Sequence, residues 1–250
     1  MGELVRVRQH DGIAVVALHR PEKLNALSNA VERDLDAALA SEEVRGSRAV
    51  VLAGEGRAFC AGADVREMRD ATPAGILAYY RELGDVYERV ARLRQPTVAA
   101  IHGYCLGGGF ELALACDFRV ADTTAVFGLP EVAIGIVPSS GGTHRLVRAV
   151  GAARAKELLL LRRRVDAQEA LRFGLVTEVV DEGDAMDLAT AMAGELAGLP
   201  PLAVEVAKHA VDLMAESSRE AGLMIERLAY GVLSQTEEHR ESTGSFGSEV

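Results

Sequence analysis

The sequence predicts an α/β protein with a helical C-terminal region, and three observations support this fold class. Short apolar runs of strand length alternate with longer segments whose apolar residues recur at helical spacing. Apolar residues make up 49% of the 250 residues and aromatic residues only 4%, so Ala, Leu and Val fill the core. From Gly141 onward the pattern is mostly helical. We therefore expect one core domain at residues 1–195 and a helical region at 196–250.

The first two predicted strands form a β-hairpin. They cover residues 5–8 and 13–18, and Asp11-Gly12 between them is a strong two-residue turn signal. Residues 48–53 (RAVVLA) are continuously apolar after Arg48, which is typical of a parallel strand buried on both faces. Further strands are predicted at 97–101, 118–121, 125–127 and 176–180. Helices are predicted at 28–40, 73–93, 109–115, 141–150, 152–161, 166–173, 184–197, 201–216 and 219–234.

Charge and cysteine usage argue against several classes of protein. The net charge is −10, spread along the chain, whereas a nucleic-acid-binding surface needs a basic patch, so we expect no nucleic-acid partner. No apolar run is long enough to cross a membrane, and the N-terminus has no apolar signal core, so we expect a cytoplasmic protein. Cys60, Cys105 and Cys116 form no CxxC pair, which indicates free thiols. No His, Cys or Asp cluster has metal-ligand spacing.

Three consecutive glycines begin the predicted helix at 109–115. Gly107-Gly108-Gly109 let the backbone approach a ligand closely, and the first turn of a helix has unpaired N–H groups that suit an anionic oxygen. No Lys-Ser/Thr follows, so the run is not a P-loop, and its spacing is not that of a dinucleotide fingerprint. The alternative is that the glycines only allow the helix to pack tightly on a sheet.

The loop before Asp64 also consists of small residues at a possible helix start. Ala61-Gly62-Ala63 directly precede Asp64, which could open a short helix. One interpretation is an ordinary helical N-terminus with Asp64 near the positive end of the dipole. The functional interpretation is that the N–H groups of Ala63 and Gly108 converge on one oxygen. Two such donors form an oxyanion hole, whose removal typically costs about 10²–10³ in rate per donor.

Two glutamates stand in apolar surroundings near these glycines. Glu111 lies three residues after Gly108, and Glu131 precedes the apolar run at 132–137. Buried carboxylates are rare unless they are paired or functional. Two carboxylates that share a site have their pKa values pushed apart, which suits acid–base chemistry.

Five segments of the chain together resemble one protein family. The sequence is similar to the enoyl-CoA hydratase/isomerase (crotonase) superfamily over about residues 5–240, with these motifs in the family's order: HRPEKLNALS, GRAFCAGADVREM, IHGYCLGGGFELALACDFRVA, FGLPEVAIGIVPSSGGTHRL and AQEALRFGLVTEVV. The resemblance implies a crotonase (ClpP-like) spiral of ββα units whose C-terminal helices form a homotrimer, often paired into a homohexamer. It also implies an acyl-CoA thioester as substrate.

The resemblance assigns a role to each candidate residue. Ala63 and Gly108 match the two oxyanion-hole donors that hold the thioester oxygen. Glu111 and Glu131 match the two catalytic carboxylates of the hydratase branch, in which Glu111 activates water and Glu131 protonates C2. The implied reaction is the syn hydration of a 2-enoyl-CoA in acyl-CoA or fatty-acid metabolism. No cofactor is implied, because coenzyme A is part of the substrate.

Further residues match family positions that contact the substrate or its CoA moiety. The resemblance implies CoA contacts near the adenine and phosphates from the segment that follows Arg20, and contacts with the acyl thioester from segments that flank the carboxylates and the oxyanion hole. These residues are Lys23, Asn25, Ala26, Leu27, Ala61, Asp64, Val65, Gly107, Pro130, Pro138 and Gly142.

The chain also departs from the family pattern at three places. Leu161-Arg162 replace a Thr-Gly pair that normally ends a helix, so we expect a longer helix and a reshaped acyl-pocket wall. The C-terminal residues RESTGSFGSEV lack the basic run with which family members commonly help a neighbouring subunit bind CoA. Phe110, where a small residue is common, is expected to narrow the pocket. These departures leave the acyl group open.

Three alternatives compete with the hydratase hypothesis. Within the superfamily the same oxyanion hole serves enoyl-CoA isomerases and acyl-CoA hydrolases, and a catalytically silent acyl-CoA-binding paralogue is a third alternative. Ser140 and His144 stand at i, i+4 spacing, but no third residue orients the histidine and no GxSxG elbow surrounds the serine, so a nucleophile–base pair is disfavoured.

Overall fold

Two β-sheets and the helices around them form the core of the protein. The computed structural model describes residues 3–69, 72–82 and 86–246. The larger sheet has the strand order β1-β2-β3-β4-β6-β9, in which β1 pairs antiparallel with β2 and all the other pairs are parallel. Its strands are β1 (Val5–His10), β2 (Ile13–Leu18), β3 (Ala49–Gly54), β4 (Thr97–Ile101), β6 (Phe118–Asp122) and β9 (Glu178–Val180).

The hairpin and the buried parallel strand are confirmed. Asp11 and Gly12 have φ values of 48° and 77° between β1 and β2, as a two-residue hairpin turn with two positive φ angles requires. Every residue of β3 is buried, which explains why its sequence is apolar without alternation.

A smaller sheet lies beside the first and makes the fold a spiral of ββα units. It contains β5 (Tyr104–Leu106), β7 (Val126–Gly128) and β8 (Val165–Asp166), in that order. The chain alternates between the sheets, because β4 is followed by β5 and β6 by β7. After β3 the chain also reaches this layer, where Cys60 bridges Cys105. Each turn of the spiral therefore adds one strand to each layer.

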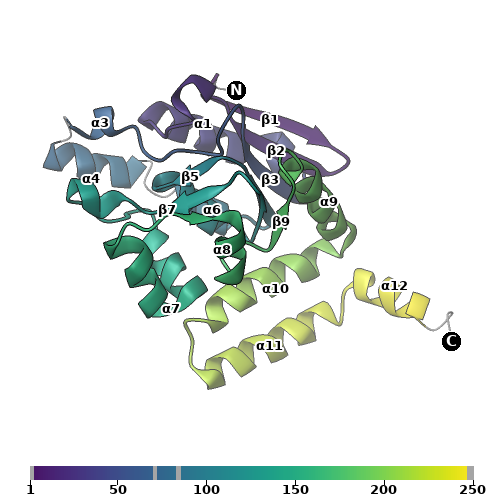
Figure 1. Ribbon diagram of the computed structural model, residues 1–250. Coiled ribbons are helices and arrows are strands. Elements are labelled where there is room, and N and C mark those ends of the chain that lie inside the picture. Colours follow the sequence, from purple (N-terminus) through teal and green to yellow (C-terminus); the bar gives the residue numbers. More distant parts are fainter. Residues whose placement is uncertain (1–2, 70–71, 83–85, 247–250) are drawn as a thin grey trace.

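The helices cover the sheets and extend beyond them to the C-terminus (Figure 1). The chain also has two short 3₁₀ helices, η1 (Pro21–Lys23) and η2 (Glu131–Ile134). The α-helices are α1 (Asn29–Leu39), α2 (Glu42–Arg45), α3 (Val65–Arg69), α4 (Pro73–Glu82), α5 (Val86–Ala91), α6 (Gly108–Ala115), α7 (Gly142–Leu160), α8 (Ala167–Arg172), α9 (Ala185–Gly198), α10 (Pro201–Met214), α11 (Arg219–Leu233) and α12 (Glu237–Phe246).

The two faces of the larger sheet are covered by different helices. On one side α9 packs against β3, β4 and β6 and buries Ala185, Ala189 and Ala193. On the other side α1 packs against β1 and β2, while α5 packs against both α1 and α6. All eight residues of α6 are buried, so the helix is apolar all round except for Glu111.

A partly buried ion pair connects the C-terminal helices to the core. Lys208 of α10 binds Asp117 at 2.8 Å, and Asp117 also accepts hydrogen bonds from the amide and hydroxyl of Thr97 at the start of β4. Helix α11 packs against α10 on the side away from the sheets, and α12 runs outward to the C-terminus (Figure 1). None of the helices in the described part of the chain combines the length and apolar character needed to span a bilayer.

Some predicted elements differ from those observed. The helix predicted at 73–93 corresponds to α4 and α5, and its residues 83–85 lie outside the described residues. The sequence did not predict α2, β5, β8 or α12, because elements of two to four residues carry no periodicity and the α12 sequence is polar. The two helices predicted at 141–150 and 152–161 are confirmed, because α7 is interrupted at Gly151, which has a non-helical φ of 75° and ψ of 162°.

The expected lengthening of the helix at Leu161-Arg162 is wrong. Helix α7 ends at Leu160, and Arg162 adopts a left-handed φ of 53°, the conformation that a glycine normally supplies at a helix C-terminus. An arginine can occupy this conformation at a cost of about 1–2 kcal/mol. The chain therefore turns at the end of α7 although Arg162 stands where the family pattern has a glycine.

Gly109 allows α6 to lie against the segment after β3. A Cβ at Gly109 would lie 2.4 Å from the Cys60 carbonyl oxygen and 2.6 Å from Cys60 Cβ, so Gly109→Ala must displace backbone. We expect this substitution to lower the free energy of unfolding by at least about 2 kcal/mol in urea denaturation. Gly198→Ala, at a helical glycine with no neighbour within 4 Å, is the matched control and should change it by less than about 1 kcal/mol. Equal effects would contradict the close-packing argument.

Candidate active site

Two chain segments bring the amides of Ala63 and Gly108 together. Ala63 bridges Leu27 as in a parallel ladder, in which Leu27 N–H donates to the Gly62 carbonyl at 2.9 Å and Asp64 N–H donates to the Leu27 carbonyl at 2.7 Å. Alternate amides of such a ladder point away from the partner strand, so the Ala63 N–H points away from Leu27. A Cβ at Gly108 would lie 3.8 Å from the Ala63 nitrogen, which places the two residues side by side.

Both amides are available to bind an oxygen. Within residues 3–69, 72–82 and 86–246, neither the Ala63 N–H nor the Gly108 N–H donates a hydrogen bond. Gly108 is the first residue of α6, so its amide also carries the positive end of the helix dipole. Gly107 before it has a φ of 51° and ψ of −129°, a conformation available to glycine. This geometry suits an oxyanion hole.

Glu111 lies one helical turn further along α6 and is 4% exposed. Its Oε1 accepts hydrogen bonds from the amides of Ser140, at 2.8 Å, and Gly142, at 2.9 Å. Burial raises the pKa of Glu111, and the two amides act against this effect because they stabilise the charged form. The carboxylate is therefore buried, fixed in one orientation and supported as an anion on one of its oxygens.

Glu131 approaches the glycines from the opposite chain segment, at the start of η2. A Cβ at Gly107 would lie 3.2 Å from Glu131 Oε1, so this carboxylate lies next to the residue before Gly108. Its Oε2 is buried, and no described group of the chain forms a hydrogen bond with it. Burial raises the pKa of Glu131 to about 7, and the charge of Glu111 contributes in the same direction. Glu131 therefore carries a proton in a large fraction of molecules at neutral pH.

The two carboxylates differ in the way that acid–base chemistry requires. Glu111 is supported as an anion by two amides, whereas Glu131 has an oxygen without a partner and holds its proton to about pH 7. Such a pair, beside a hole for a negatively charged oxygen, can remove a proton at one atom and deliver one at another.

Several residues predicted to contact CoA are engaged within the chain. The Asn25 side chain is buried and donates to the carbonyls of Glu55 at 2.9 Å and Ala58 at 2.8 Å. Arg20 donates to the Ala26 carbonyl at 3.1 Å and to Asp64 Oδ2 at 3.0 Å. The hydrogen bond between Arg20 and Asp64 lowers the pKa of Asp64. These residues shape the segment before Ala63, and their contact with CoA stays a prediction.

The other predicted residues fall into two groups. The structure places Leu27, Gly107, Pro130, Pro138 and Gly142 beside the amides, the carboxylates or the loop that binds Glu111. A Cβ at Gly142, for example, would lie 2.5 Å from Glu111 Cγ. Ala61 precedes the hole and is partly buried, whereas Lys23 and Val65 are exposed and free to contact a bound molecule.

Sequence reasoning missed two groups near the site. Glu32 is buried on α1, and its Oε1 accepts hydrogen bonds from the hydroxyls of Tyr79 at 3.0 Å and Tyr87 at 3.1 Å. The Tyr87 hydroxyl would lie 3.1 Å from a Cβ at Gly108. Arg145 of α7 binds the Ser140 carbonyl at 2.9 Å. A charged residue on a predicted amphipathic helix gives no sign of such a contact, because polar residues there are normally solvated.

Neither His144 nor Cys60 is placed for nucleophilic catalysis. His144 Nε2 lies 3.1 Å from Glu216 Oε1 and not beside Ser140. Burial raises the pKa of the Cys60 thiol to about 12, so Cys60 acts as a packing residue.

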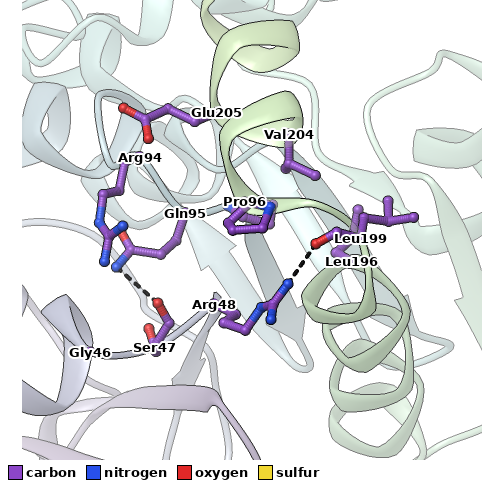
Figure 2. A pocket seen from close by; sticks show the side chains of 11 residues that line it. Gly46, Ser47, Arg48, Arg94, Gln95, Pro96, Leu196, Leu199, Val204 and Glu205 are labelled. Carbon is purple, nitrogen blue, oxygen red and sulfur yellow. Dashed lines mark hydrogen bonds between the residues drawn. The ribbon is translucent and has the colours of Figure 1, made fainter. Parts of the chain in front are cut away.

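A cavity of about 160 Å³ lies elsewhere, between the core and the α9–α10 corner (Figure 2). Arg48 Nη2 donates to the Leu199 carbonyl at 2.7 Å and Gln95 Nε2 to the Ser47 carbonyl at 3.3 Å. The Arg48 bond ties the end of α9 to the core, and the carboxylates of the candidate site do not line the cavity.

The arrangement defines a class of enzyme that polarises a carbonyl group and moves protons at neighbouring atoms. Comparison with known proteins identifies the family. The family model described as enoyl-CoA hydratase/isomerase matches residues 8–248. The chain belongs to the enoyl-CoA hydratase/isomerase family, and its fold is the crotonase fold.

Individual relatives cover nearly the whole chain. A probable enoyl-CoA hydratase of Rhizobium meliloti is 40% identical over 98% of this chain and 95% of its own length. The short-chain-enoyl-CoA hydratase of Clostridium acetobutylicum is 36% identical over 94% of this chain and 90% of its own. The solved structure of enoyl-CoA hydratase from Bacillus anthracis has a TM-score of 0.92 and 36% identity, and covers 99% of this chain and 97% of that chain.

The raised pKa of Glu131 makes the folded protein less stable at higher pH. The unfolded chain loses this proton near pH 4.5 and the folded chain near pH 7, so the stabilisation present below pH 4.5 is lost as the pH rises through 7. Glu131→Gln has no such loss. We therefore expect its free energy of unfolding, relative to wild type, to increase between pH 4.5 and pH 8 in urea denaturation. The exposed Glu178→Gln is the control, and a pH-independent difference for Glu131→Gln would contradict the assignment.

Proposed function

We propose that the protein is an enoyl-CoA hydratase, which adds water across the C2=C3 bond of a 2-enoyl-CoA thioester to give a 3-hydroxyacyl-CoA. The observation that carries this proposal is the pair of carboxylates, Glu111 and Glu131, beside two unoccupied amide donors. Family membership supplies the substrate class, and the pair supports hydration because water addition needs both a base and an acid.

The first part of the mechanism is polarisation of the thioester. In the proposed complex the N–H groups of Ala63 and Gly108 donate to the thioester oxygen. When a nucleophile attacks C3, electrons move through C2 onto this oxygen, which becomes an enolate. Donors fixed by the backbone stabilise that charge without reorganisation, and each is typically worth about 10²–10³ in rate.

The second part is proton transfer to and from the two glutamates. Glu111 takes one proton from water as the water oxygen bonds to C3, and Glu131 delivers its proton to C2 as the enolate collapses. Both groups act from the same side, so the addition is syn. A pKa of about 7 suits Glu131 for this role, because a general acid is most effective when its pKa lies near the working pH. The proton gained by Glu111 then restores Glu131 through water.

The surroundings fit an acyl chain attached to a charged carrier. Ile134 is 60% and Val137 65% exposed in the segment between Glu131 and the loop on Glu111, which gives an apolar surface beside the carboxylates. Lys23 is exposed before the oxyanion-hole segment and is proposed to meet the CoA phosphates. The reaction as written uses only the two carboxylates, the amides and water, and therefore needs no cofactor. The cytoplasmic location stays a prediction from the sequence.

Substitution of each glutamate tests the proposal directly. The assay is loss of enoyl-thioester absorbance with crotonyl-CoA and with a longer 2-enoyl-CoA. Wild type should hydrate at least one of them, and Glu111→Gln and Glu131→Gln should each lose at least about a hundredfold in kcat, because each removes one proton transfer. Double-bond migration or CoA release by wild type would instead favour an isomerase or a hydrolase. Thioester binding without turnover would favour a non-catalytic paralogue.

We also propose that the C-terminal region, residues 196–250, forms a homotrimer or a homohexamer. The helices α10 and α11 expose a set of apolar side chains that a solvated helix pair would not need: Val211, Leu213, Met224, Leu228, Tyr230 and Val232. An interface between copies of the chain would cover them.

Sedimentation tests this assembly. Analytical ultracentrifugation at micromolar concentration should give three or six times the mass of the chain. Leu228→Glu places a charge on the exposed apolar face and should shift the distribution toward smaller species, whereas Glu226→Gln on the same helix should not. A clean monomer of the wild-type protein would contradict the proposed interface.

A further inference from the structure

We propose that Arg145 is a positioning residue for hydration, which holds the loop at 138–141 so that the amides of Ser140 and Gly142 stay on Glu111. This inference rests on the proposed function, because Glu111 is the base of that reaction. Arg145 itself acts through the loop and is not assigned a contact with substrate.

The contacts of Arg145 form a continuous path to the carboxylate. Its Nη1 donates to the Ser140 carbonyl at 2.9 Å, and the amide of the same Ser140 donates to Glu111 Oε1 at 2.8 Å. Its Nη2 forms an ion pair with Glu88 of α5. The guanidinium group is therefore held at one end by an acid and holds the peptide of Ser140 at the other. The Arg145 side chain is 14% exposed and Ser140 is buried, so solvent screens this contact little, whereas Glu88 is 42% exposed.

Hydrogen bonds of regular secondary structure do not support the loop. No helix or strand lies between η2, which ends at Ile134, and α7, which begins at Gly142. Val137 and Ser139 are exposed, and Gly135 and Gly141 have φ values of 79° and 89°. Pro138 and Ser140 are buried in this loop, so Arg145 acts together with their packing to place the two amides on Glu111.

Gly141 makes room for the guanidinium group. A Cβ at Gly141 would lie 2.2 Å from Arg145 Nη1 and 3.0 Å from Cζ, so the arginine fills the space over this glycine. The Arg145 amide also donates to the Gly141 carbonyl at 2.9 Å as the first turn of α7 forms. The side chain and the backbone amide of Arg145 thus bind the adjacent carbonyls of Ser140 and Gly141 at the end of the loop.

Helix α5 connects this loop to the oxyanion hole. Glu88, which binds Arg145, directly follows Tyr87, whose hydroxyl would lie 3.1 Å from a Cβ at Gly108. The same short helix therefore contacts the oxyanion-hole side of the site and, through Arg145, the loop that orients Glu111. A fixed distance between base and oxyanion hole is what hydration needs, because a misplacement of about 1 Å can cost about 10²-fold in rate.

The test compares two arginines on α7. Arg145→Gln removes the bonds to Ser140 and Glu88, whereas Arg148→Gln, three residues further on, removes exposed ion pairs with Glu216 at 3.3 Å and Asp212 at 3.7 Å. We expect Arg145→Gln to lower kcat for crotonyl-CoA at least tenfold with KM within about threefold, since the loss affects the base and not the binding of substrate. Arg148→Gln should retain wild-type kcat. Glu88→Gln should show a smaller fall in kcat than Arg145→Gln.

Two further readouts separate positioning from a general structural role. Added guanidinium at millimolar concentration should recover part of the kcat of Arg145→Gln and none of that of Glu111→Gln. Hydrogen exchange of peptides covering residues 138–142 should be faster in Arg145→Gln than in wild type or Arg148→Gln, with the thermal midpoint of the two variants alike. Unchanged kcat, unchanged exchange, or an equal loss in Arg148→Gln would overturn the inference.

The exchange experiment does not depend on the reaction. If wild type failed to hydrate any enoyl-CoA, the proposed function would fall, while faster exchange in Arg145→Gln would still show that the arginine holds the loop. If wild type hydrated and exchange did not change, the role of Arg145 alone would fall.

Discussion

The hydrogen bonds between Glu111 and the amides of Ser140 and Gly142 are the interaction on which the candidate site depends. Glu111 belongs to a helix whose other residues are apolar and buried, and a carboxylate there is costly without partners. Two backbone donors offset that cost and at the same time fix the direction of the side chain. These two amides leave the other oxygen, Oε2, unengaged. The same two hydrogen bonds therefore support the burial of this residue and the role proposed for it.

Close backbone approach makes the rest of the site possible. Gly107 and Gly142 stand where a Cβ would meet the carboxylates of Glu131 and Glu111, and Gly109 stands where a Cβ would meet the chain after β3. The donors at Ala63 and Gly108 are main-chain groups, so their positions are set by the two sheets and by α6 rather than by side-chain rotamers. Such donors need no reorganisation when charge develops on the substrate.

The protein tolerates unfavourable electrostatics at this site. Glu131 has a buried oxygen that no group in the described part of the chain hydrogen-bonds, and its pKa of about 7 lies well above that of a solvated glutamate. The folded chain therefore loses stability near neutral pH to keep an acid available there. Glu32 on α1 is a second buried carboxylate of this kind. Its Oε1 accepts hydrogen bonds from Tyr79 and Tyr87, and no described group hydrogen-bonds its buried Oε2.

The sequence by itself determined the hairpin, the buried strands, the start of α6 and the four residues of the proposed machinery. Each of these depends on a local signal: Asp11-Gly12 for a turn, a continuous apolar run for β3, glycines before a helix, and a glutamate in an apolar stretch. Each of these signals acts through local sterics or solvation and does not depend on the rest of the chain. Motif resemblance added the reaction and the pairing of Glu111 with Glu131.

Only the tertiary structure decided how these residues are held. Asn25 is occupied with the carbonyls of Glu55 and Ala58, and Arg145 reaches the loop on Glu111 and the acid on α5, although neither side chain shows any local peculiarity in the sequence. Glu88 and Arg145 are 57 residues apart, and Glu111 and Gly142 are 31 apart. Contacts at such separations arise from the stacking of successive ββα turns, which brings segments distant in the chain to one side of the sheets, and no local pattern encodes them.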